Sequence, residues 1–222
     1  MNYTIAIVDD HPLFIEGFKS YLSLNRKIER LETAANGRQF IELIEGGYLP
    51  HIVFMDIMMP VMDGIEATRH IKANHSDVKV IALSSLESLE HVEKMIDAGV
   101  DGYLLKEATP DEINKAIEAV MNENNYFSNK IVLSLSKRAI NGNSHQVNNS
   151  PVSLTGREKQ LLILLCKGLS RQEIASSLHI SEKTVDKHKE NILAKTGCKN
   201  LIRLVIYSIK NKLVSLDALT HL

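Results

Sequence analysis

The chain has 222 residues with 26 Lys and Arg against 27 Asp and Glu, which is enough length for two compact domains with separate cores. The net charge of −1 hides a division: residues 1–150 carry 14 basic and 21 acidic side chains, whereas residues 151–222 carry 12 and 6. A basic C-terminal region is typical of nucleic-acid binding. Cys166 and Cys198 form no paired-cysteine motif, which argues against a disulfide framework or a zinc site. The densest apolar run, Leu161 to Cys166, is too short to cross a bilayer, so we expect a cytoplasmic protein without a membrane anchor.

The first half of the chain alternates between five apolar strand-like runs and helical patterns, from Thr4 to about Asn124. The third, fourth and fifth runs are apolar throughout, as in strands that are covered on both faces. Helix-start signals precede three of the helical patterns, at Pro12, at Asp63-Gly64 and at Thr109-Pro110. The pattern predicts an α/β domain with a five-stranded, doubly wound parallel sheet.

The second half shows no strand pattern. A short amphipathic helix is expected around Ser128 to Ala139, and the polar stretch Asn141 to Ser150 that comes after it lacks apolar residues to pack, so we expect a linker there. After Pro151 the periodicity predicts an all-helical domain with four helices, at about Gly156 to Lys167, Arg171 to Leu178, Glu182 to Lys195 and Asn200 to Ile209.

Acidic, hydroxyl and basic residues stand where four of the predicted strands end: Asp9 and Asp10, Asp56, Ser84, and Lys106. Open parallel sheets bind ligands outside the carboxyl ends of their strands, so these side chains are expected to converge. Three neighbouring carboxylates need a cation, and without a His-Cys cluster Mg²⁺ is the natural candidate. Asp56 could then attack phosphorus as a nucleophile, while Lys106 and Ser84 bind the phosphoryl group.

Simpler interpretations exist for the single residues. Asp10 could cap the helix that starts near Pro12, Asp63 could be only a turn or cap residue, and Lys106 could be a solvated lysine at a strand end.

Four motifs together resemble the receiver domain of two-component response regulators: Val8-Asp9-Asp10-His11-Pro12, Met55 to Pro60 with Asp63-Gly64, Leu83-Ser84-Ser85 and Tyr103-Leu104-Leu105-Lys106. The resemblance covers about Met1 to Glu123 and implies a flavodoxin-like fold. It implies that Asp56 accepts phosphate from a sensor histidine kinase. Asp10, Asp56 and the backbone carbonyl of Met58 would hold Mg²⁺, with Asp9 assisting through water. Ser84 and Tyr103 would form a switch pair in which the hydroxyl moves toward the phosphate and the ring turns inward, although half-buried packing is the commoner role for a lone tyrosine.

The side chains beside the phosphorylation site predict slow self-dephosphorylation. Met58 and Leu86, two residues after Asp56 and Ser84, are apolar and cannot readily orient an attacking water.

The segment Leu169 to Val185 predicts two helices joined by a three-residue turn, with Ser181 as the cap of the second: a helix-turn-helix. On the second helix one face is mostly apolar, with Val185, His188, Ile192 and Thr196. The other face is charged, with Lys183, Asp186, Lys187 and Glu190, and is available to DNA.

The C-terminal sequence, about Val152 to Val214, resembles the LuxR-type DNA-binding domain through Leu154-Thr155-Gly156-Arg157-Glu158, Gly168-Leu169-Ser170, Glu173-Ile174-Ala175 and Thr184 to His188. The resemblance implies that the helix from Glu182 to Lys195 enters the major groove of double-stranded DNA, and that the helix from Asn200 to Ile209 forms a dimer contact. The DNA-binding residues expected are Lys183, Thr184, Asp186, Lys187, His188 and Glu190. Asp186 or Glu190 would read C·G pairs and Lys187 would read guanine.

A receiver joined to a LuxR-type domain makes the NarL/FixJ class of response regulators. We therefore predict a receiver over residues 1–124, a linker with a short helix over 125–151, and a DNA-binding domain over 152–216. The expected function is phosphorylation-controlled transcription by a protein that dimerises on phosphorylation and binds promoter DNA. Two alternatives remain open. One is a magnesium phosphohydrolase that uses Asp56, but Met58 occupies the position where such an enzyme needs an acid/base aspartate. The other is a DNA-binding or interaction module that no longer receives phosphate.

Overall fold

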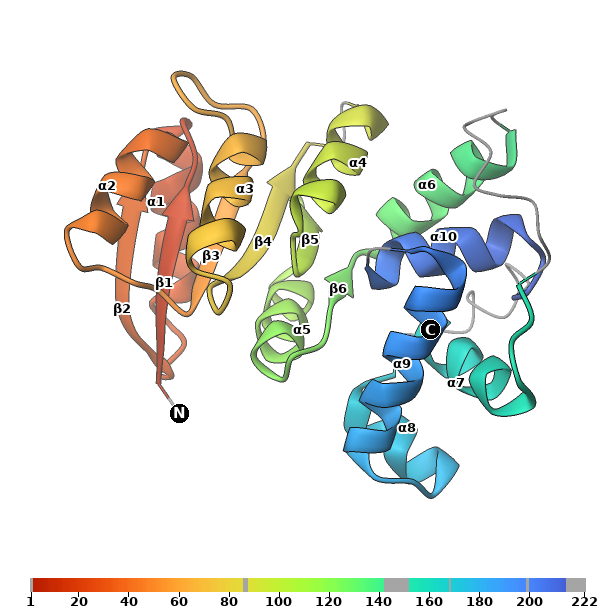
Figure 1. Cartoon of the computed structure of the whole chain (residues 1–222). Coiled ribbons are helices and arrows are strands. Elements are labelled where there is room, and N and C mark those ends of the chain that lie inside the picture. The colour runs from red at the N-terminus through yellow and green to blue at the C-terminus, as the bar shows by residue number, and fades with distance from the viewer. Residues whose placement is uncertain (1, 86–87, 142–151, 168, 199, 215–222) are drawn as a thin grey trace. The chain divides into compact units, whose positions relative to one another are not determined.

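The computed structural model describes residues 2–85, 88–141, 152–167, 169–198 and 200–214 (Figure 1). The chain divides into two compact units, Met1–Ser128 and Asn129–Leu222. Among the described residues, every helix is too short or too polar to cross a bilayer.

The first unit is built on a parallel sheet with strand order β2-β1-β3-β4-β5-β6. Its strands are β1 (Tyr3–Val8), β2 (Ile28–Ala34), β3 (Ile52–Asp56), β4 (Lys79–Ser84), β5 (Gly102–Leu105) and β6 (Tyr126–Phe127). The first five strands and their flavodoxin-like order confirm the predicted doubly wound sheet. The two-residue strand β6 was not predicted. It forms because Tyr126 and Phe127 pair with β5, a long-range contact that the local sequence pattern does not indicate.

Helices cover both faces of this sheet. They are α1 (Pro12–Leu22), α2 (Gly37–Glu45), α3 (Gly64–Asn74), α4 (Leu89–Ala98) and α5 (Pro110–Met121). On one face, residues of α1 and α5 pack on alternate strand residues such as Ile7, Phe54 and Leu83. Figure 1 shows α2, α3 and α4 in front of the opposite face. Because both faces are covered, β3 and β5 are buried along their whole length, as their apolar sequences predict.

The second unit is all-helical, with α6 (Asn129–Asn141), α7 (Gly156–Cys166), α8 (Arg171–Leu178), α9 (Glu182–Thr196) and α10 (Leu201–Lys210). The four predicted C-terminal helices are found with ends that differ by at most one residue. Capping boxes at Thr155 and Ser170 start α7 and α8, and Ser181 and Asn200 cap α9 and α10 with their side chains.

The short helix predicted near Ser128 is α6, which packs against α10. Most of the predicted linker after it, residues 142–151, lies outside the described residues. The domain boundaries at 124 and 152 stay predictions.

Candidate phosphorylation site and nucleic-acid interface

Three carboxylates meet at the carboxyl ends of β1 and β3, where the sheet changes its winding direction. Asp9 and Asp10 come directly after β1, and Asp56 is the last residue of β3. Asp9 is fully buried and Asp56 is 5% exposed, whereas the Asp10 side chain is 32% exposed. Neighbouring strands β1 and β3 pair in parallel register, which is what brings their ends to one point.

Lys106 completes this cluster from the loop after β5. Its Nζ lies 2.7 Å from Asp9 Oδ2 and 3.1 Å from Asp56 Oδ1. Burial lowers the pKa of the Lys106 ammonium, but the close contact with Asp9 and the charge of Asp56 outweigh it and leave the pKa raised. Lys106 is therefore a fixed positive charge in the site and not a solvated lysine.

The charge balance at Asp56 favours a cationic ligand. Burial and the neighbouring Asp9 charge raise the pKa of the Asp56 carboxyl, and Lys106 opposes that shift. One ammonium faces three carboxylates, so a further positive charge would stabilise the ionised form of Asp56.

The donor set fits a divalent cation. Ligand atoms of Asp9, Asp10, His11 and Asp56 all lie within 4.8 Å of one another. Asp9 Oδ2 and Asp10 Oδ1 are buried and have Lys106 and His11 as ion-pair neighbours, without the well-aligned hydrogen bonds that usually satisfy buried oxygens. Such oxygen lone pairs are suited to a hard cation such as Mg²⁺.

The predicted switch residues lie on neighbouring strands. Ser84 ends β4 and Tyr103 lies on β5, with a side chain that is fully buried. Burial raises the pKa of the Tyr103 phenol and the nearby Ser84 hydroxyl opposes that shift, but the phenol oxygen is buried without a well-aligned hydrogen bond. The tyrosine ring therefore occupies the inward position in this structure.

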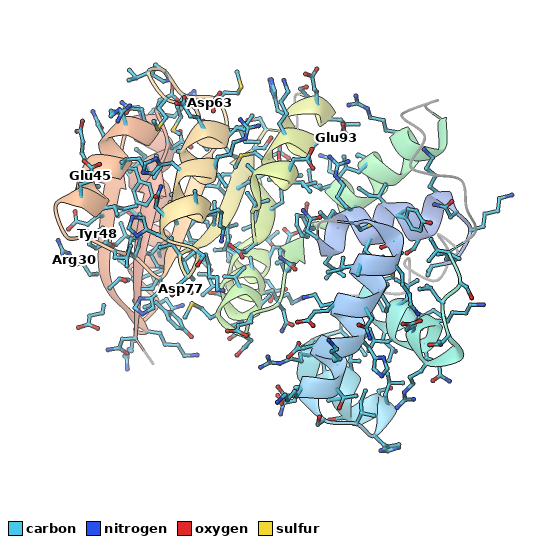
Figure 2. All side chains as sticks on the ribbon, in the orientation of Figure 1. Arg30, Glu45, Tyr48, Asp63, Asp77 and Glu93 are labelled. Carbon is cyan, nitrogen blue, oxygen red and sulfur yellow. The ribbon has the colours of Figure 1, made fainter. Side chains whose placement is uncertain are left out.

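The loop after Asp56 positions its backbone closely. Asp63, labelled in Figure 2, caps α3 by accepting a hydrogen bond of 2.8 Å from the Glu66 backbone N–H. The simpler interpretation of Asp63 as a cap is confirmed, whereas Asp10 is not the cap of α1, since His11 holds that position. A Cβ atom at Gly64 would lie 1.9 Å from the Asp56 carbonyl oxygen, so only glycine fits there.

The helix-turn-helix of the second unit consists of α8, a turn at His179, Ile180 and Ser181, and α9. His179 adopts a left-handed conformation (φ 52°) that ends α8. The Ser181 side chain accepts the Thr184 N–H and also bonds the Thr184 hydroxyl at 2.8 Å. The Ser181 cap therefore holds both the backbone and the side chain of Thr184 in the first turn of α9.

The predicted faces of α9 are separated by burial. Val185, Ile192 and Thr196 are buried and His188 is half-buried, while Lys183, Lys187 and Glu190 are exposed. The charged face is thus accessible, as the periodicity predicts.

A side-chain contact that the sequence does not reveal holds Asp186. Its Oδ2 lies 3.3 Å from Arg171 Nη1, and Arg171 Nε also donates to Glu182 at 2.9 Å. Asp186 and Glu182 belong to the next helix, and helical periodicity carries no signal of such a pairing. To read a base, Asp186 has to exchange its arginine partner for a base amine.

Comparison with known proteins gives matches to both units. Residues 5–118 match the response regulator receiver domain, and residues 152–208 match the luxR family of bacterial regulatory proteins. The transcriptional regulatory protein DegU of Brevibacillus brevis is 36% identical over 220 residues, with 93% of each chain covered. The structure of the response regulator ChrA of a heme-sensing two-component system is 28% identical, covering 96% of this chain and 99% of ChrA, with a TM-score of 0.53.

The fold also resembles that of RcsB in a structure described as two RcsB dimers bound to two parallel DNAs. That chain is 23% identical and has a TM-score of 0.56, with 95% of this chain and 99% of RcsB covered.

Proposed function

Since the chain belongs to the two-component response regulators of the NarL/FixJ class, we propose that Asp56 is its phosphoacceptor and that a sensor histidine kinase is its phosphodonor. The protein is a DNA-binding transcription regulator and not a metabolic enzyme. The observation that carries the proposal is the placement of Asp56 between two carboxylates and the Lys106 ammonium.

The chemistry at Asp56 depends on this placement. A carboxylate oxygen of Asp56 attacks the donor's phosphorus to form an acyl phosphate, and the donor histidine leaves. Asp10, Asp56 and the Met58 carbonyl would hold Mg²⁺, with Asp9 assisting, and the bound ion would supply positive charge for the transferring oxygens. Lys106 would move its ammonium from Asp56 Oδ1 toward the phosphoryl group, and the Ser84 hydroxyl would donate a hydrogen bond to it.

Ser84 and Tyr103 are proposed to respond to phosphorylation as a switch. When Ser84 turns to the phosphoryl group, its hydroxyl gains a charge-assisted hydrogen bond and moves away from the nearby Tyr103 phenol. Phosphorylation would then favour the inward position that the Tyr103 ring occupies in this structure, and so alter the surface formed by α4, β5 and α5 and the partners that it binds.

The decisive measurement for Asp56 is the intact mass after incubation with acetyl phosphate, with and without Mg²⁺. The wild type is expected to gain one phosphoryl group only with Mg²⁺, and Asp56→Asn, which removes the nucleophile, is expected to gain none. Asp77→Asn, at an exposed aspartate, is the matched control and should behave as wild type. Equal labelling of Asp56→Asn would place the acceptor elsewhere.

The apolar neighbour of Asp56 supports slow loss of the phosphoryl group. Met58 is 57% exposed and offers no group that orients a water, and Leu86 lies outside the described residues. Met58→Asn is expected to shorten the lifetime of the phosphorylated protein; a lifetime equal to or longer than that of wild type contradicts this role.

For DNA, α9 is proposed as the recognition helix, with the two protomers of a homodimer occupying two half-sites. Lys187 and Glu190 are exposed and pair loosely with each other at 3.7 Å, so both can turn to bases. Lys183 is proposed as a phosphate contact, while Thr184 and His188 support the docking of α9. Asp186 joins base reading only by leaving Arg171.

Selection of bound sequences from a random library tests these roles. Lys187→Ala is expected to relax the preference for guanine at one position, and Glu190→Ala the preference for cytosine, at about 1–3 kcal/mol each. Lys183→Ala should weaken binding to all sequences alike. If Glu190→Ala binds every site more tightly with the same base preference, the proposed contact of Glu190 with cytosine is wrong.

A further inference from the structure

His11 is the one member of the carboxylate cluster that the proposed chemistry does not use. It is the residue before α1, its backbone is extended (φ −99°), and its side chain makes no capping hydrogen bond. The ring is 68% exposed, yet Nδ1 lies 3.1 Å from Asp9 Oδ1 and 3.0 Å from Asp10 Oδ1. The ring nitrogen is thus directed at the carboxylates.

The separations suit one coordination sphere. Ligands about 2.1 Å from an octahedral ion lie roughly 3 Å apart when adjacent and roughly 4.2 Å apart when opposite. The ligand atoms of Asp9, Asp10, His11 and Asp56 are mutually within 4.8 Å, so small side-chain adjustments bring those of Asp10, His11 and Asp56 to one ion, with Asp9 beside it. The Nδ1 proton that faces Asp9 and Asp10 in this structure has to move to Nε2 when Nδ1 binds the ion, and the exposure of the imidazole leaves Nε2 accessible to take it.

We propose that His11 Nδ1 is a further ligand of the divalent cation, and that it makes this site select Mn²⁺ over Mg²⁺. The inference rests on the proposed cation site at Asp56. Mg²⁺ prefers oxygen and keeps several waters, so a nitrogen in place of one water adds little to its binding. Mn²⁺ also binds carboxylates and, although it binds nitrogen most weakly of the first-row divalent ions, it gives up a water for an imidazole more readily than Mg²⁺ does, so for Mn²⁺ the nitrogen adds a bond.

The test compares cation affinities of the full chain in wild type, His11→Ala and His70→Ala. His70 is an exposed histidine on α3 outside the cluster and controls for the loss of any imidazole. Binding of Mn²⁺ is measured by the electron paramagnetic resonance signal of the free ion, and binding of Mg²⁺ by its competition with Mn²⁺. His11→Ala is expected to weaken Mn²⁺ binding about tenfold or more and Mg²⁺ binding by less than about twofold. His70→Ala should change neither.

Pulsed electron paramagnetic resonance of bound Mn²⁺ gives a second, direct measurement. A ¹⁴N modulation is expected in wild type and His70→Ala and should be lost in His11→Ala, which still binds Mn²⁺ through its carboxylates. This signature distinguishes coordination from a merely structural effect. Equal weakening of both ions, no change in either, or a ¹⁴N modulation that persists in His11→Ala would overturn the inference.

The result also separates this inference from the proposed function. If wild type binds Mn²⁺ without a ¹⁴N modulation and still gains a phosphoryl group with Mg²⁺, only the role of His11 is wrong. If wild type binds neither ion, the cation site itself fails and both proposals fall.

Discussion

At the scale of single residues, Asp56 shows a conflict between stability and chemistry. The raised pKa of its carboxyl means that the folded protein binds the proton more tightly than the unfolded chain. The stability from this group is complete below the unfolded pKa and is lost as the pH rises through the folded pKa. At neutral pH the ionised Asp56 therefore costs stability, which is consistent with a group kept for reaction.

Asp56→Asn is accordingly expected to be more stable than wild type at pH 7 without metal, by about 1 kcal/mol, the usual scale of a single substitution. The gain should shrink as the pH falls below the ordinary aspartate pKa of about 3.9, because the raised pKa of Asp56 favours its protonated form there. Thermal unfolding in chelator at both pH values measures it. Asp77→Asn, at the exposed aspartate labelled in Figure 2, should show no such pH-dependent gain.

Val61 carries backbone strain next to this site. It has φ 70°, a left-handed conformation that disfavours β-branched residues, and its side chain is 82% exposed, so packing does not repay the cost. Val61→Asn is expected to raise the free energy of unfolding by about 1 kcal/mol, because asparagine tolerates this region. Urea titration of the metal-free protein checks it, with Val61→Ala as a control that gains less. A loss of stability in Val61→Asn would show that the valine side chain has a packing role.

The residue scale also shows where sequence reasoning ends. Asp9, Asp10, Asp56 and Lys106 could be placed together because parallel strands end at one edge, a rule that needs only strand order. The pairing of Asp186 with Arg171 depends on side-chain directions across two helices, which residue identity does not specify. Likewise, nothing in the sequence marks Val61 as left-handed.

At the scale of elements, helix starts explain why the predicted and observed helices agree so closely. Ser, Thr and Asn side chains cap α7 to α10, and each accepts a backbone N–H that the helix leaves unpaired. Such caps depend only on residues that are close in the sequence, so the sequence alone predicts them. The strand β6 is not local: it consists of two residues whose pairing with β5 decides their conformation.

Glu158 links two elements of the second unit. It is 3% exposed, bonds Thr155 in the capping box of α7, and receives Lys195 of α9 on both carboxylate oxygens at 2.8 Å. The hydrogen bonds from Lys195 and Thr155 lower the pKa of its carboxyl. That stability is present above the unfolded pKa and is lost as the pH falls through the folded pKa.

Glu158→Gln is therefore expected to destabilise the second unit by about 2 kcal/mol at pH 7, the scale of a hydrogen bond to a charged group. The difference from wild type should diminish at acid pH, and urea titration at pH 7 and at acid pH measures it. Glu173→Gln is the matched control, since Glu173 closes a capping box of the same kind with Ser170 but is exposed; its loss should stay below about 1 kcal/mol. Equal losses for the two variants would mean that Lys195 contributes nothing.

At the scale of the whole molecule, the described residues of each unit form a hydrophobic core of their own, and these two clusters share no residue. One core joins β1, β3, β4 and β5 to α1 and α5, and the other joins α7, α8, α9 and α10. Asp56, the proposed phosphoacceptor, thus lies in the first unit, whereas α9 belongs to the core of the second. A signal from Asp56 to α9 would therefore act through dimerisation or through a change at the surface of the first unit, and not through repacking of one common core.

Separate cores predict two unfolding transitions in scanning calorimetry of the full chain. Mg²⁺ at one hundred times its Kd should raise the free energy of unfolding of the first unit by about 2.7 kcal/mol, and so raise the midpoint temperature of that transition alone. Glu158→Gln should lower only the midpoint temperature of the other transition. Asp56→Asn identifies the first transition, since it should weaken the response to Mg²⁺ without moving the second. A single transition that both Mg²⁺ and Glu158→Gln shift would mean that the two cores unfold as one cooperative unit, and phosphorylation could then reach α9 through folding stability alone.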